Sequence, residues 1–544
     1  MKSNLLNFPG GADASLGLAG QANMGEMRED ALLLGYDFGT SAVKAVLVDR
    51  KGGVLRSASG AYPLNLPASG HAEQNPMDWW TAMADATRQL LPESDALRGR
   101  VVGLGIAAQM AGTIPVDAAG EPLHPCLTWM DTRSTAVAHE ITKGGIRVAG
   151  YGITRLLPWL WLANGAPNLA GKDPLSKILW FRAKRPDIWQ AAARFLDVKD
   201  WLIHRLTGNF TTTPDVAQLS WLMNNRMGQR AWSQKWLDRM GVDQARLPEI
   251  VDSAAVAGGL TQAAAKFLGL PQGLPVAGGC GDINACALAA GDQDDGAYHL
   301  HLGTSLWLGA HSRRRYVDPF SGTATLCAAA ADRYFLVATQ ETAGAAASWA
   351  ATALGFGEGK PGLQALDTSA AEARPTADAP LFLPWLHGER VPINDPHLRG
   401  ALVGMTLRTS RGELVRSILE GVALNARWAF DNASRMLPAK DSPLRMMGGG
   451  AESAVWMRIF ADILQRPLFV LDAPAYAGAC GAAMTAGLAC GVQSEFAAAA
   501  EMVCTGTVIE PDRSLKALAD HRYRYFLGYG RSHQRHDKKG LRHD

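Results

Sequence analysis

Residues 32–48 read Leu-Leu-Leu-Gly-Tyr-Asp-Phe-Gly-Thr-Ser-Ala-Val-Lys-Ala-Val-Leu-Val. The apolar runs over 32–36 and 43–48 predict two strands, and the turn residues between them predict a hairpin. A glycine followed by two hydroxyl residues can bring backbone N–H groups and side-chain donors close to a phosphate. The candidate ligand residues are therefore Gly39, Thr40, Ser41 and Lys44 for phosphate and Asp37 for Mg²⁺, the alternative being an ordinary hairpin turn.

A second hairpin of the same kind lies about half a chain length further on. The apolar run His299–Leu302 leads into Gly303, Thr304 and Ser305, and Leu306–Gly309 continues as a predicted strand. Self-similarity of this kind indicates a duplicated architecture. We therefore expect one phosphate-binding loop in each half, with the two loops facing each other across an interdomain cleft.

Strands and helices alternate in both halves, which predicts α/β domains with helices on the sheet faces. Strand patterns occur at 101–107 and 275–277, and helical patterns begin at 282 and cover 413–437. The chain is predicted to consist of a flexible extension at 1–28, a first domain at 29–290, a second domain at 291–530 that begins with a polar linker, and a basic flexible tail at 531–544.

The composition excludes several classes of protein. Of 544 residues, 47% are hydrophobic and 19% are charged, which excludes a disordered or collagen-like chain. A net charge of +2 provides no field for nucleic acid, and no apolar run reaches the length of a membrane span. Seven cysteines without a C-x-x-C pair are typical of a reducing compartment. We expect a soluble cytoplasmic protein that binds neither nucleic acid nor membrane.

Two glycine-rich segments are further candidates for chemistry. Asp282 follows Gly278-Gly279-Cys280-Gly281 at a predicted helix start, so it is either an N-cap or a general base that accepts a proton from a substrate hydroxyl. Residues 446–451, Met-Met-Gly-Gly-Gly-Ala, expose bare backbone that suits a flat base or a ribose. A simple glycine-rich turn is the alternative for the second segment.

Other nucleotide and catalytic motifs do not fit. Gly359-Lys360 is followed by Pro361 and lacks the earlier glycine of a P-loop. Gly103-x-Gly105-x-x-Ala108 has no evident acidic partner on a second strand, as a dinucleotide-binding site requires. Zinc-protease spacing and the G-x-S-x-G hydrolase motif are both absent.

The chain resembles the FGGY carbohydrate kinases of the actin/hexokinase-like ATPase superfamily. The family's second signature is matched by Gly-Ala-Leu-Val-Gly-Met at 400–405 and Glu-Leu-Val-Arg-Ser-Ile-Leu-Glu at 413–420. The segment 381–390 and the Glu-Gln-Asn-Pro stretch at 73–76 also look like the family, and the first signature is matched in part around Lys177. The resemblance covers about residues 32–528. It implies two actin-like (ribonuclease H-like) α/β domains facing across an ATP/sugar cleft.

The resemblance also implies residue roles. Asp37 looks like the metal-linked aspartate and Asp282 like the catalytic base, which also contacts the substrate. The implied ATP-binding residues are Gly39, Thr40, Ser41, Lys44, Gly303, Thr304, Ser305, Gly344, Gly449, Gly450, Ala451 and Ala454. The implied sugar-binding residues are Gln109, Met110, Ala111, Trp129, Asp131 and Arg133. ATP and Mg²⁺ are the expected cofactors, and a homodimer is a further expectation because relatives often dimerise.

Within the family the pattern is most similar to the xylulokinases, which implies phosphorylation of a terminal hydroxyl of a ketopentose. The sugar-binding segment of those enzymes usually reads Gln-Met-His-Gly, and here Ala111 takes the place of the histidine. Because a pocket selects a sugar mainly through contacts to its hydroxyls, this loss leaves other acceptors open. These are ribulose, a tetritol, a deoxy-sugar or another polyol, with a non-catalytic actin-like ATP switch as the alternative of a different class.

Overall fold

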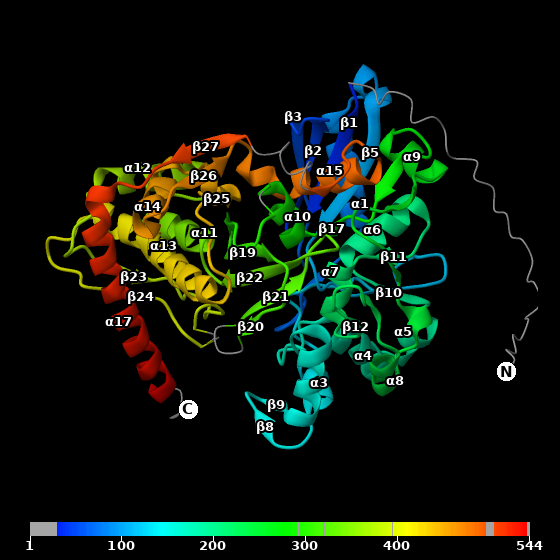
Figure 1. The fold of residues 1–544 in the computed structure, drawn as a ribbon, viewed down its shortest axis with the longest axis horizontal. Coiled ribbons are helices and arrows are strands. Elements are labelled where there is room, and N and C mark those ends of the chain that lie inside the picture. The colour runs from blue at the N-terminus through cyan, green and yellow to red at the C-terminus, as the bar shows by residue number, and fades with distance from the viewer. Residues whose placement is uncertain are drawn as a thin grey trace, which may run out of the picture.

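A computed structural model describes residues 30–291, 293–318, 322–393, 395, 397–496 and 505–540. The predicted N-terminal extension at 1–28 lies outside the described residues. Both predicted hairpins are present with the expected strands, each continued by one to three residues. The chain forms two large sheets that lie side by side, with helices around and between them (Figure 1).

The first sheet has the order β15-β16-β5-β1-β2-β3, with β17 pairing to β5. Its strands are β1 Leu32–Phe38, β2 Ala42–Asp49, β3 Val54–Ala61, β5 Val101–Ala108, β15 Val256–Gly259, β16 Pro275–Ala277 and β17 Cys280–Gly281. The hairpin β1–β2 is antiparallel and pairs Asp37 with Lys44 across the strands. Strand β5 runs parallel to β1 and to β16.

The second sheet has the order β20-β21-β22-β19-β18-β25-β26-β27. Its strands are β18 Tyr298–Leu302, β19 Leu306–Ser312, β20 Val317–Asp318, β21 Thr323–Cys327, β22 Tyr334–Gln340, β25 Leu444–Met447, β26 Leu468–Leu471 and β27 Gly506–Ile509. The run β22-β19-β18-β25-β26-β27 repeats the order and directions of β3-β2-β1-β5-β16-β15. This confirms the duplication that the two Gly-Thr-Ser triplets predict.

Helices cover and separate the sheets. Those before the second sheet are α1 Pro76–Leu90, α2 Thr135–Thr142, α3 Ile153–Ala163, α4 Pro174–Lys184, α5 Pro186–Ala191, α6 Val198–Thr207, α7 Pro214–Ala217, α8 Gln234–Met240, α9 Gln262–Leu268 and α10 Asp282–Ala289. Those after it are α11 Gly344–Ala353, α12 Gly359–Glu372, α13 Arg411–Met436, α14 Ala454–Leu464, α15 Ala477–Ala489 and α17 Lys516–Gly540. Helix α13 begins at a capping box between Ser410 and Glu413, close to the predicted start.

Short strand pairs connect these elements. They are β4 Glu73–Gln74 with β7 Cys126–Leu127, β6 Ile114–Val116 with β10 Arg194–Leu196, β8 Arg147–Val148 with β9 Tyr151–Gly152, β11 Thr211–Thr212 with β14 Glu249–Ile250, β12 Met223–Asn224 with β13 Ala231–Trp232, and β23 Leu381–Leu383 with β24 Ala401–Val403. No helix of the described residues has the length and apolar character needed to cross a membrane.

Helices α10 and α15 lie where the two sheets meet (Figure 1). One hydrophobic cluster joins Leu33 and Val46 of the first sheet, Ala479 and Ala483 of α15, and Trp307 of the second sheet. Helix α15 therefore packs on the first sheet although its residues belong to the second half of the chain. The predicted boundaries at 29–290 and 291–530 do not capture this exchange.

The last helix extends into the predicted tail. Helix α17 continues to Gly540, whereas the sequence analysis expects a flexible tail from residue 531. Its earlier turns bury Phe526, and the Nε2 atom of His533 lies 2.9 Å from the carbonyl oxygen of Arg399. The contact of His533 lies past residue 531, where the sequence predicts a flexible tail. Residues 541–544 lie outside the described residues.

Two histidines of β18 are expected to make the fold sensitive to acid. Neither ring nitrogen of His299 has a hydrogen-bond partner among the described residues. Burial lowers the pKa of His299, the charges of His311 and His301 adding to the effect, and burial together with Lys44 lowers the pKa of His301 to about 4. Below about pH 6.5, His299 and His301 therefore bind protons in the unfolded chain more readily than in the folded chain.

We expect His301 alone to lower the free energy of unfolding by on the order of 2 kcal/mol between about pH 7 and about pH 5. Buried carboxyl groups whose pKa values are raised, such as Asp37, Asp197 and Asp282, act in the opposite direction over this range, so urea unfolding measures the histidine contribution as the difference between the wild type and a variant. His299→Phe keeps a ring between Trp307 and Phe335, and its change in stability from about pH 7 to about pH 5 should differ from that of the wild type by the loss of the acid destabilisation due to His299. An identical slope in the wild type and this variant would contradict the assignment for His299.

Candidate active site

The first phosphate-loop candidate is a tight turn after β1. The Gly39 N–H donates to the carbonyl oxygen of Ala42 at 3.1 Å, and the Tyr62 hydroxyl donates to the carbonyl oxygen of Gly39 at 2.6 Å. The side chain of Trp129 reaches this loop, where its Nε1–H donates to Thr40 Oγ1 at 3.1 Å. The loop is thus fixed next to one of the predicted sugar-binding residues.

Asp37, the residue before the end of β1, has one unsatisfied carboxylate oxygen. Its Oδ1 atom is buried without a hydrogen-bond partner, and a side chain at Gly478 would meet its Oδ2 atom. Burial raises the pKa of Asp37 to about 6, although Lys44 opposes this rise. A hard cation favours a free carboxylate oxygen of this kind, so the residue fits the Mg²⁺ role that the sequence predicts.

Asp282 lies at the first position of α10. Its Oδ1 atom accepts a hydrogen bond from the Ile283 N–H at 2.8 Å, which leaves Oδ2 for other partners. Burial, together with the negative charge of Asp37, raises its pKa to about 7. A carboxylate with a pKa near neutrality is suited to accept a proton from a hydroxyl.

A hydrogen-bond network around Asp215, which no sequence motif marks, holds this helix start. Asp215 of α7 accepts hydrogen bonds through Oδ2 from the Gly281 N–H at 2.7 Å and from Asn284 Nδ2 at 3.2 Å. The Asn284 amide also binds the second half, because it donates to the Cys327 carbonyl and accepts from the Ala329 N–H. Asp215 has no motif around it in the sequence, so only its place in the fold reveals it.

The predicted acceptor-binding segment 109–111 follows β5 and lies beside the catalytic candidate. The Sδ atom of Met110 would clash with any side chain at Gly281. Ala111 has a φ of 64°, and its carbonyl accepts a hydrogen bond from Lys177 Nζ at 2.8 Å. Lys177 also donates to the Thr128 carbonyl at 2.7 Å, so one buried ammonium joins the segment to the residue before Trp129.

The side chains of Gln109, Asp131 and Arg133, which are predicted to bind the sugar, contact other residues of the chain. Gln109 Nε2 donates to Gln74 Oε1 at 2.7 Å. Asp131 accepts from the Ala72 N–H and forms an ion pair with Arg133, which also pairs with Glu73 at 2.6 Å. Asp131 and Arg133 therefore support the loop that carries Trp129, and their direct contact with an acceptor stays a prediction.

The second loop brings the predicted nucleotide-binding glycines together. The Gly344 N–H, at the start of α11, donates to the Gly303 carbonyl at 2.9 Å, and the Ala343 and Ala345 N–H groups donate to the Thr304 carbonyl. Gly448 has a φ of 89°, and a side chain there would meet the carbonyl of Leu302.

Beyond it, the short 3-10 helix Gly449–Glu452 precedes α14, and Gly449 and Ala454 are exposed. The predicted nucleotide-binding residues thus gather at the ends of β18 and β25, and Gly449 has no atom within 4 Å of the place where a side chain would begin. Ser305 lies in the same turn, where its carbonyl accepts from the Gly303 N–H.

The two halves approach each other at this site. Lys44 of β2 is close enough to His301 of β18 to lower the pKa of this histidine. The two hairpins that carry the loops therefore lie close together. At a second place, Gln218 Oε1 accepts from the Cys327 N–H at 2.9 Å, and Asn164 Nδ2 donates to the Tyr316 carbonyl at 2.7 Å. The side chains of both amides are buried.

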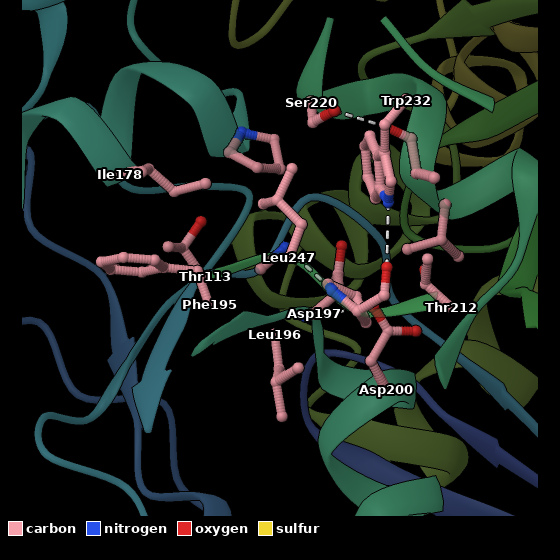
Figure 2. A pocket seen from close by; sticks show the side chains of 15 residues that line it. Thr113, Ile178, Phe195, Leu196, Asp197, Asp200, Thr212, Ser220, Trp232 and Leu247 are labelled. Carbon is pink, nitrogen blue, oxygen red and sulfur yellow. Dashed lines mark hydrogen bonds between the residues drawn. The ribbon is translucent and has the colours of Figure 1, made fainter. Parts of the chain in front are cut away.

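A small cavity lies behind the acceptor segment (Figure 2). Its volume is about 30 Å³, and Thr113, Asp197 and Trp232 are among the residues that line it. Asp197 Oδ1 accepts from the Gly112 N–H at 3.0 Å, and its Oδ2 has no partner, so burial raises the pKa of Asp197 to about 7. The cavity suits one or two water molecules rather than a sugar.

Models of the FGGY family of carbohydrate kinases match most of the chain. The N-terminal domain model covers residues 32–289 and the C-terminal domain model covers residues 299–490. The chain is 31% identical over 433 residues to the xylulose kinase of Escherichia coli strain K12, which spans 79% of this chain and 84% of that protein. It is 26% identical to the gluconokinase of Bacillus subtilis strain 168, over 87% of this chain and 90% of that protein.

The fold is also similar to that of solved structures of xylulose kinases. The crystal structure of xylulose kinase from Rhodospirillum rubrum superposes with a TM-score of 0.78 and 26% identity, covering 93% of this chain and all of that one. The two-domain α/β fold that the sequence resemblance implies is therefore confirmed.

Proposed function

This chain belongs to the FGGY family of carbohydrate kinases, and from that premise we propose that it transfers the γ-phosphoryl group of ATP to a terminal hydroxyl of a ketopentose such as xylulose. The proposal rests above all on Asp282, a carboxylate with a pKa near neutrality that is close enough to Asp37 for the charge of Asp37 to raise this pKa. The relatives include xylulose kinases and a gluconokinase, which act on different acceptors. The identity of the acceptor is therefore the most specific part of the proposal.

In the proposed mechanism Asp282 accepts the proton of the acceptor hydroxyl as its oxygen attacks the γ-phosphorus. The bond from the γ-phosphorus to the bridging oxygen breaks, and ADP leaves. Asp215 and Asn284 hold the helix start that carries Asp282, so the carboxylate stays aimed at the acceptor. Met110 and Trp129 would line the acceptor on the side of the first half.

The two loops would bind the phosphates. Thr40 and Ser41 in the first half and Thr304 and Ser305 in the second supply N–H and hydroxyl donors, and Lys44 supplies a positive charge. Gly344, Gly449, Gly450 and Ala451 would leave room for the nucleoside. Mg²⁺, held near Asp37, would neutralise charge on the phosphates.

The proposal keeps two alternatives. A kinase of another polyol or sugar would share this mechanism, and Ala111 is the residue that most directly leaves that choice open. An actin-like ATP switch would need no acceptor, and the place of Met110 against Gly281, the residue before Asp282, favours the kinase. A cytoplasmic location and a homodimer remain part of the proposal.

An assay of ADP release tests the acceptor. Mg·ATP is supplied with a panel of pentuloses, polyols, hexoses and sugar acids, and turnover is measured against each. We expect D-xylulose to support turnover well above the rate without an acceptor. Turnover with a tetritol or hexose but none with any pentulose would overturn the ketopentose assignment while leaving the kinase assignment intact.

A further inference from the structure

One peptide group of the predicted acceptor-binding segment lies between a buried lysine and a buried aspartate. The carbonyl oxygen of Ala111 accepts a hydrogen bond from Lys177 Nζ at 2.8 Å, and the N–H of Gly112 donates to Asp197 Oδ1 at 3.0 Å. This carbonyl and this N–H belong to the same peptide bond. An ammonium at the carbonyl end and a carboxyl oxygen at the N–H end both match the direction of the peptide dipole. The plane of this peptide is therefore fixed from both ends.

Further contacts hold the two side chains in place. Lys177, in α4, is completely buried, and its ammonium also donates to the carbonyl oxygen of Thr128 at 2.7 Å. Burial lowers the pKa of Lys177 to about 8, so most of it carries a positive charge at neutral pH. Asp197 is the N-cap of α6, where its Oδ1 atom also accepts from the Val198 N–H at 2.7 Å. Hydrogen bonds from a charged donor are stronger than those between neutral groups, so the lysine holds its carbonyl partners firmly.

The peptide follows a residue in an uncommon backbone conformation. Ala111 has a φ of 64°, in the left-handed region that a residue with a Cβ atom rarely adopts. Without partners at both ends, the peptide could rotate and Ala111 could return to an ordinary conformation. Gly112 is tightly enclosed, because a Cβ atom there would stand 2.8 Å from Val198 and 2.9 Å from Asp197. The conformation of this segment thus depends on the partners of one peptide bond.

The same segment reaches the candidate catalytic residue. Met110, the residue before Ala111, lies against Gly281, and Gly281 precedes Asp282. A rotation of the peptide after Ala111 would therefore move Met110 away from the surface that we assign to the acceptor. Predicted nucleotide-binding residues such as Gly449 lie in the second half of the chain. We therefore expect the rotation to weaken binding of the acceptor more than binding of ATP.

We infer that Lys177 and Asp197 are positioning residues for the acceptor, which act by holding the Ala111–Gly112 peptide between them. Neither has to touch the acceptor, and both affect its binding rather than the transfer of the phosphoryl group. The inference rests on the proposed function, because it takes residues 109–111 as part of the acceptor site. It applies to any sugar or polyol that contacts this segment.

The test is the KM for D-xylulose, or for the best acceptor of the panel if another is preferred. Asp197→Ala removes the partner of the Gly112 N–H, and Lys177→Met removes the donor to the Ala111 carbonyl. Each should raise the KM for the acceptor about tenfold, the order expected for the loss of a hydrogen bond to a charged group, while kcat and the KM for ATP change less than about threefold. Asp197→Asn keeps an oxygen for the Gly112 N–H and should stay within about threefold of the wild type.

A double variant tests whether the two residues act through one peptide. Lys177→Met combined with Asp197→Ala should raise the KM for the acceptor by about as much as the larger single change, whereas independent effects would multiply to about 100-fold. Thr261→Ala removes the N-cap side chain of α9 and is the control for the loss of a helix cap. It should leave the KM for the acceptor unchanged. If Lys177→Met does not fold, the contrast between Asp197→Ala and Asp197→Asn still decides.

The possible outcomes separate the inference from the proposed function. An unchanged KM for the acceptor in Asp197→Ala, an equal rise in the KM for ATP, or effects that multiply in the double variant would overturn the inference and leave the proposed function standing. A wild type that phosphorylates no acceptor of the panel would overturn the proposed function, and the inference with it.

Discussion

Asp282→Asn is expected to lower kcat at least about 100-fold while ATP affinity stays within about twofold of the wild type. The amide keeps the size of the carboxylate, and its oxygen can still accept from the Ile283 N–H. What it loses is the ability to take a proton from the acceptor. Steady-state ADP release gives kcat, and calorimetric titration gives ATP affinity.

The pH dependence of kcat in the wild type also tests the role of Asp282. Because burial raises the pKa of Asp282 to about 7, the base is increasingly ionised as the pH rises through neutrality, and kcat should rise with it. Asp187→Asn, a change at an exposed aspartate, is the control and should keep full activity. A kcat for Asp282→Asn within tenfold of the wild type would show that another group accepts the proton.

Gly105→Val is expected to destabilise the fold by about 3 kcal/mol or more, the upper range for overpacking in a core. Gly105 lies on β5 under α15, and a Cβ atom there would stand 1.9 Å from the carbonyl oxygen of Ala482. The helix must move away from the first sheet to make room. Chemical unfolding of the variant measures the loss.

The same change should disturb the proposed site. The first turn of α15 contains Gly478, which lies against the Asp37 carboxylate, so a displaced helix exposes Asp37 to solvent. Gly99→Val is the matched control, because a Cβ atom at Gly99 has no atom within 4 Å. Equal stability of the Gly105 and Gly99 variants would show that α15 is not closely packed on the sheet.

Local sequence patterns predict the hairpins well. The apolar runs around Asp37 and Gly303 give strands, and their repetition gives the duplication, because strand and turn signals are short-range. The start of α10 at Asp282 follows for the same reason. Placement of α15 on the first sheet depends on contacts between distant residues such as Gly35 and Ala479, which no local pattern contains.

Some residues of the candidate site can likewise be predicted from local sequence patterns, and others cannot. Glycine-rich turns and a carboxylate at a helix start are visible as motifs, so Asp37, Asp282 and both loops could be listed from the sequence. Asp215 and Asn284 could not, because each depends on a partner from another segment. The ion pair of Asp131 with Arg133 also shows that a residue type at a family position does not fix whether its side chain is free for a ligand.

The most direct test of the account is the ratio of ADP formed to phosphorylated acceptor recovered, measured in the wild type with Mg·ATP in the presence and absence of D-xylulose. We predict ADP formation that depends on the acceptor, with one phosphorylated acceptor for each ADP. ADP formation at the same rate without an acceptor, and no phosphorylated acceptor with any sugar or sugar acid tested, would contradict the account and favour an ATP switch.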